Sequence, residues 1–143
     1  MRRLLPLEIG FLTVVLAGAG CNSTTNSDVS LPNQNLRMIG QAYTQATDKL
    51  NRGPANLQEL MPYLEKLGDP TNILRSANDG EEFVILWKVD YRTAENGANP
   101  PVTAYEKKGR NGKRQVLKVR SIFQMTDEDF KQAPFPAGHT PPN

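Results

Sequence analysis

The chain has 143 residues and a formal net charge of +2, with 17 Lys and Arg against 15 Asp and Glu. This length suggests one domain, and so small a charge argues against nucleic acid as the main partner. The single cysteine, Cys21, cannot form an intrachain disulfide. It lies far in sequence from the single histidine, His139, which argues against a zinc site or a Cys–His catalytic pair. No metal and no cofactor is expected.

The first twenty residues are typical of an export signal. Arg2 and Arg3 form a positive start, and residues 9–20 are uncharged. A membrane-spanning helix needs about 20 apolar residues, so this stretch is too short to cross a bilayer. Its length is that of the apolar region of a signal peptide.

Small residues lead up to the cysteine: Ala17, Gly18, Ala19 and Gly20. A run of small residues directly before a cysteine resembles the lipobox of bacterial lipoproteins. That resemblance implies that residues 1–20 are removed after Gly20 and that a lipid is attached to the thiol of Cys21. The chain would then be exported and held to the cell membrane by a lipid anchor at Cys21. Asn22, in the place where an aspartate would retain the protein in the inner membrane, favours the outer membrane.

Two other interpretations of this segment stay open. Gly10-Phe11 resembles the cleavage point of a prepilin leader, but Val15 stands where pilins need a glutamate. An ordinary secretory signal followed by a chance cysteine is the other alternative.

The polar residues 21–34 are predicted to be a flexible tether. An amphipathic helix is expected from near Asn35, and its apolar face is Leu36, Ile39, Tyr43, Ala46 and Leu50. A second, shorter helix is expected after Asn56, an N-cap with Glu59 three residues later. Its buried side would be Leu57, Leu60, Met61 and Leu64, and Gly68 would end it.

Strands are predicted over residues 82–90, 102–107 and 114–125, and a loop is predicted over residues 92–101. The turn between the last two strands contains Asn111-Gly112, which tolerates the positive φ angles of a hairpin. These two strands should therefore pair antiparallel, with Leu117, Val119, Phe123 and Met125 on one face of the second.

The expected fold class is α+β: an N-terminal amphipathic helix and a short second helix packed on a small antiparallel sheet of about three strands. This domain would cover residues 35–136, followed by an irregular tail over 137–143. The pattern Leu36, Ile39, Ala42, Tyr43, then Gly53-Pro54, then Leu57 and Leu60 resembles the soluble part of type IV pilins and type II secretion pseudopilins. The resemblance implies a pilin-like fold only, because the long apolar helix that assembles pilin filaments is replaced here by a lipobox.

Seven cations within residues 107–120, with no acid among them, form the main candidate binding site. Lys107, Lys108, Arg110, Lys113 and Arg114 predict an anion-binding hairpin, and Lys118 and Arg120 complete the set. The competing interpretation is a solvated edge hairpin. The acidic run 79–82 is interpreted as a plain turn rather than a calcium loop.

No catalytic motif is recognised, and His139 is expected to be exposed without a partner, so an enzyme is not predicted. The expected function is a lipid-anchored protein with a structural or interaction role at the cell envelope, where it would bind a protein or an envelope polymer. The alternative is an envelope protein that binds an anion or a small ligand through the basic hairpin at residues 107–120.

Overall fold

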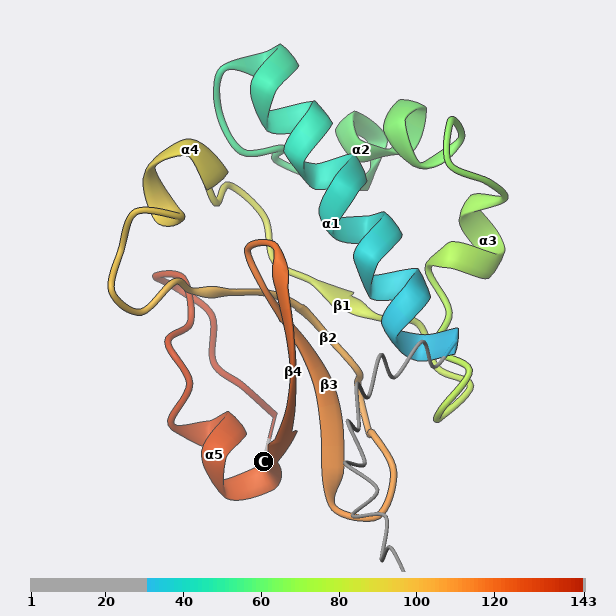
Figure 1. The fold of residues 1–143 in the computed structure, drawn as a ribbon, viewed down its shortest axis with the longest axis vertical. Coiled ribbons are helices and arrows are strands. Elements are labelled where there is room, and N and C mark those ends of the chain that lie inside the picture. Colours follow the sequence, from blue (N-terminus) through green and yellow to red (C-terminus); the bar gives the residue numbers. More distant parts are fainter. Residues whose placement is uncertain (1–30, 143) are drawn as a thin grey trace, which may run out of the picture.

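The computed structural model describes residues 31–142. The predicted leader, the lipidation site Cys21 and the tether up to residue 30 lie outside the described residues. Within them the fold is α+β: helices and an antiparallel sheet of four strands (Figure 1). The elements in chain order are α1 (Leu31–Leu50), α2 (Leu57–Leu64), α3 (Pro70–Ile73), β1 (Val84–Ile85), α4 (Tyr91–Ala94), β2 (Val102–Tyr105), β3 (Lys113–Lys118), β4 (Ser121–Thr126) and α5 (Asp127–Lys131).

The long helix α1 has the buried face that its sequence predicts. Leu36, Ile39, Tyr43 and Ala46 are fully buried, and Leu50 packs against them at the end of the helix. The helix begins at Leu31 rather than near Asn35, so residues 31–34 belong to the helix and not to a tether. Proline in the first turn does not interrupt a helix, because the N–H that it lacks has no intrahelical partner there.

The second helix is capped as predicted but packs elsewhere. The Asn56 side chain accepts a hydrogen bond from the Glu59 N–H at 3.1 Å. Leu60 and Leu64 are buried, whereas Leu57 is 40% exposed, so its predicted burial is wrong. The contacts of α2 are with α1 and α3, so it covers α1 rather than the sheet (Figure 1).

The predicted strand over residues 114–125 is in fact two strands. β3 and β4 form a hairpin in which Lys118 is opposite Ser121, and the turn between them is Val119-Arg120. Val119 has a φ of 55°, which a β-branched residue rarely adopts. The sheet therefore has four strands instead of about three, in the order β1-β2-β3-β4. The shared face predicted for residues 117–125 is broken at the turn, and Phe123 is 45% exposed.

The predicted strand over residues 82–90 is also much shorter than expected. Only Val84–Ile85 pair with β2, and the chain then leaves the sheet through Lys88, whose φ is 65°. The Lys88 N–H donates to the Pro54 carbonyl at 2.8 Å, which ties this segment to the turn after α1. The predicted loop over 92–101 begins inside a short helix, α4.

Both faces of the sheet are covered. One core lies between α1 and the sheet, and a second lies on the other face and contains Leu86, Val102, Tyr105, Val116 and Phe130. α5 and the segment after it close this second core. In that segment His139 is half-buried, and its Nε2 lies 3.1 Å from the Tyr105 hydroxyl. The prediction of an exposed histidine without a partner is therefore wrong.

Candidate functional site

The basic hairpin predicted as a binding site is present. β2 and β3 pair antiparallel, and the turn is closed by hydrogen bonds in both directions between Arg110 and Lys113. Asn111 and Gly112 have φ angles of 54° and 69°, as the sequence predicts for this turn. The fold therefore brings the predicted cations to one hairpin.

The first two lysines of the hairpin form exposed ion pairs with the acidic turn that precedes β1. Glu81 forms ion pairs with Lys108 and, at 3.8 Å, with Lys107. The hydrogen bond from the Lys108 ammonium lowers the pKa of the Glu81 carboxyl below its usual value. Asp79 accepts hydrogen bonds from the N–H groups of Lys108 and Gly109 at 3.0 and 2.9 Å. The acidic run thus acts as a turn that holds the hairpin.

Arg114 does not face solvent. Its side chain is only 10% exposed, and its guanidinium lies over the ring of Phe130, 4.3 Å from the centroid. It pairs with Asp127 at 2.8 Å and donates to the Lys107 carbonyl at 3.2 Å. Arg114 therefore joins β3 to α5, and its guanidinium is not placed to bind an external anion through two parallel hydrogen bonds.

Of the five predicted site residues, Lys107, Lys108, Arg110 and Lys113 are exposed, but only Arg110 and Lys113 are exposed cations without an ion pair within residues 31–142. Both lie at the turn of the hairpin. Of the remaining two cations, Lys118 donates to the Asn99 side chain at 2.7 Å, and Arg120 pairs with Glu95 at 2.9 Å. The fold therefore distributes the seven charges over separate structural contacts rather than concentrating them on one surface.

A buried carboxylate behind the hairpin was not predicted from the sequence. Glu106 is fully buried, and its carboxylate accepts from the Ser76 hydroxyl at 2.7 Å, the Asn78 amide at 3.3 Å and the Gln115 N–H at 2.8 Å. Buried polar atoms are normally satisfied in this way. The cluster joins the turn before β1 to the end of β2 and to β3.

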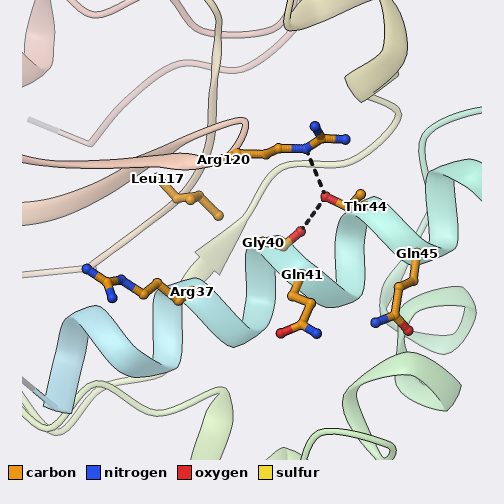
Figure 2. Close-up of a pocket in the computed structure, with 7 residues that line it drawn as sticks. All are labelled: Arg37, Gly40, Gln41, Thr44, Gln45, Leu117 and Arg120. Atoms are coloured by element: carbon orange, nitrogen blue, oxygen red, sulfur yellow. Dashed lines mark hydrogen bonds between the residues drawn. The ribbon is translucent and has the colours of Figure 1, made fainter. Parts of the chain in front are cut away.

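A groove lies between α1 and the β3–β4 turn (Figure 2). It has a volume of about 310 Å³ and is lined by Arg37, Gly40, Gln41, Thr44, Gln45, Leu117 and Arg120. Leu117 lines it but is itself fully buried, and it packs against Gly40 of α1, where an added Cβ atom would lie 3.4 Å from the leucine side chain. At one end Arg120 donates to Thr44 at 3.4 Å.

The groove offers hydrogen-bond donors, amides and a small apolar lining, and it has no paired nucleophile and base. Such a surface can offer hydrogen bonds and a small apolar contact to a ligand. Its position could not be predicted from the sequence, because the turn that forms one wall lies inside a segment predicted to be a single strand. In the part of the chain that the structure describes, no group of three acidic, histidine or cysteine side chains is placed to hold a metal ion.

Comparisons with protein-family models, with curated proteins and with solved structures gave no match. Among residues 31–142, no helix is both long and apolar enough to cross a bilayer.

Proposed function

We propose that this chain is a bacterial lipoprotein whose folded domain has an interaction role at the cell envelope. The observation that carries the proposal is the position of the sole cysteine, directly after four small residues and an uncharged stretch that is too short to span a membrane. Lipidation of Cys21 would make the membrane a partner of the mature chain. Its localisation would then be the membrane surface, with the outer membrane favoured.

The start of α1 limits how far the domain would stand from such an anchor. Residues 22–30 connect Cys21 to Leu31. Even fully extended, ten peptide steps reach only about 35 Å. The folded domain would therefore stay close to the lipid surface, where its groove can meet other envelope components.

The pilin-like character of the domain is part of the same proposal. It is supported by a long helix whose Leu36, Ile39 and Tyr43 pack onto an antiparallel sheet, followed by a Gly-Pro turn and a short helix. We infer from this arrangement a shared fold with pilin-like domains. Filament assembly is not proposed, because the apolar helix that would drive it is replaced by the lipobox.

Intact-mass measurement of the membrane fraction tests the proposal, with Cys21→Ser as the variant. The wild-type chain should lack residues 1–20 and gain the mass of a lipid, whereas the variant should gain none, because only a thiol accepts the diacylglyceryl group. The matched control is Ser23→Ala, which leaves the cysteine in place and should be lipidated normally. An unlipidated wild-type chain, or a leader cut after Gly10, would contradict the proposal.

A further inference from the structure

The outer edge of β4 lacks the features that usually protect an edge strand. β4 ends the sheet order and pairs with β3 on one side only, so among residues 31–142 no strand pairs with its outer edge (Figure 1). Its sequence, SIFQMT, has no charge, no proline and no glycine. Natural proteins usually block such an edge with a lysine, a proline or a bulge, because its free backbone groups can pair with another strand.

The register of the hairpin identifies which backbone groups are free. Lys118 and Ser121 flank a two-residue turn, so they exchange both of their hydrogen bonds. Hydrogen-bonded and non-hydrogen-bonded pairs alternate along an antiparallel ladder. The next hydrogen-bonded residue of β4 is therefore Phe123, whose backbone bonds to Val116 of β3. The N–H and C=O groups of Ile122 and Gln124 therefore point away from β3, toward the open edge.

An exposed aromatic side chain stands at the middle of this edge. Phe123 is 45% exposed, and the only other large hydrophobic residue of the described chain with comparable exposure is Leu57 on α2. Phe123 lies opposite Val116, on the face of the sheet away from α1. Its position allows contact with an identical ring from a neighbouring strand.

We propose that β4 pairs antiparallel with β4 of a second copy of this chain, around a two-fold axis at Phe123. In this register Ile122 of each copy exchanges hydrogen bonds with Gln124 of the other, and the two Phe123 rings face each other across the axis. The two four-stranded sheets then form one continuous sheet. Self-complementary pairing of this kind is the basis of isologous dimers.

The charges at the two ends of β4 favour a second copy in this orientation. Lys118 lies on β3 opposite the start of β4, Glu128 and Asp129 follow the end of β4, and none of these three is in an ion pair within residues 31–142. Antiparallel pairing places the basic end of one copy beside the acidic end of the other, whereas parallel pairing would place like charges together. Such complementarity sets the orientation and register of a contact. The inference goes beyond the proposed lipid anchor and does not depend on it.

Sedimentation equilibrium of the full chain in a density-matched detergent tests the pairing. The wild-type protein should have twice the monomer mass, and Phe123→Lys should have the monomer mass, because two ammonium groups would face each other across the axis. Leu57→Lys is the matched control: it adds the same charge at an equally exposed apolar site on α2 and should remain dimeric. Phe123→Glu alone should be monomeric, and an equimolar mixture with Phe123→Lys should recover the dimer mass.

Hydrogen exchange in the wild-type chain tests the same contact without a substitution. The amides of Ile122 and Gln124 should exchange slowly at high concentration and faster on dilution, whereas the amide of Phe123 should be protected throughout. A wild-type monomer at all concentrations, or a Phe123→Lys dimer of unchanged strength, would overturn the proposal. Protection of Ile122 and Gln124 in a monomer would also overturn it, since a segment of the same chain would then cover the edge.

Discussion

The hydroxyl of Tyr43 connects α1 to the segment that leaves the sheet after β1. It donates to the Leu86 carbonyl at 3.0 Å and accepts from the Val89 N–H at 3.1 Å. The ring stacks on Tyr91 with 4.4 Å between the centroids. Burial raises the pKa of Tyr43 to about 12, although the hydrogen bond from Val89 opposes the shift.

This raised pKa predicts a loss of stability in alkali. In the unfolded chain tyrosine ionises near pH 10, so the contribution of Tyr43 is complete below pH 10 and is lost as the pH rises toward about 12. The loss from this one group should be about 1.4 kcal/mol per pH unit in that window. Tyr43→Phe should lower the free energy of unfolding at pH 7 by about 1–3 kcal/mol, because two buried backbone groups lose their partner.

Urea unfolding of both proteins at pH 7, 10 and 11 checks this prediction. The variant should lose less stability than the wild type between pH 10 and pH 11. Equal losses in the two proteins would show that Tyr43 does not ionise on unfolding in this range.

At the residue scale, the sequence predicts burial along α1 well, because Leu36, Ile39, Tyr43 and Ala46 recur at helical spacing. The burial of Glu106 could not be predicted in the same way. Its partners Ser76 and Asn78 come from a turn about thirty residues earlier. Only the pairing of β1 with β2 brings that turn next to the carboxylate.

The turn between α1 and α2 touches the segment after β1 through a glycine. A Cβ atom on Gly53 would lie 2.3 Å from the Val89 carbonyl oxygen, and that oxygen belongs to a backbone that cannot move freely. The same two segments are joined by the hydrogen bond from Lys88 to Pro54. Gly53 therefore sets how closely the two segments approach.

Gly53→Ala should destabilise the protein by about 1–3 kcal/mol, because the added methyl group forces the two backbones apart. Gly97→Ala is the control, since a Cβ atom there would meet its nearest neighbour at 3.4 Å. Thermal or urea unfolding of the two variants measures the difference. Equal stability of the two variants would contradict the close contact.

At the element scale, turns were predicted where their residues are typical and missed where they are not. Asn111-Gly112 marked the β2–β3 hairpin because these residues tolerate positive φ. The β3–β4 turn was missed because Val119 favours extended structure, and its left-handed conformation is held by the burial of its side chain, which is 2% exposed. Tertiary packing thus overrides the local preference of the valine.

At the scale of the whole molecule, the C-terminal segment covers the second face of the sheet. The Pro134 carbonyl accepts from the Val102 N–H at 2.8 Å, and Phe135 packs against Phe130 with 5.2 Å between the ring centroids. His139 adds a contact with the hydroxyl of Tyr105. The stability of the domain should therefore depend on where the chain is cut.

A chain ending at Ala133 should lose about 2–4 kcal/mol of its free energy of unfolding, because a half-buried phenylalanine and a strand hydrogen bond are removed together. A chain ending at Pro136 keeps both contacts and should lose about 1 kcal/mol or less. Urea unfolding of the two truncated chains separates these values. A similar loss in both would assign the stability to residues 137–142 instead.

The candidate site was harder to predict from the sequence than the fold, because its geometry depends on contacts between distant parts of the chain. A run of cations is visible in the sequence, but their partners Glu81, Glu95 and Asp127 come from other elements. Only the folded arrangement shows that most of the charges are already paired. The groove beside α1 likewise exists only because a helix and a distant turn meet.

The order of the strands has a consequence for how the chain folds. Each strand pairs with the next one along the sequence, so the sheet can form by successive local contacts. Docking of α1 onto β3 is different, since it joins segments about eighty residues apart, such as Leu36 and Leu117. Because the entropy cost of closing a loop grows with its length, docking of α1 onto β3 costs more entropy than pairing two neighbouring strands.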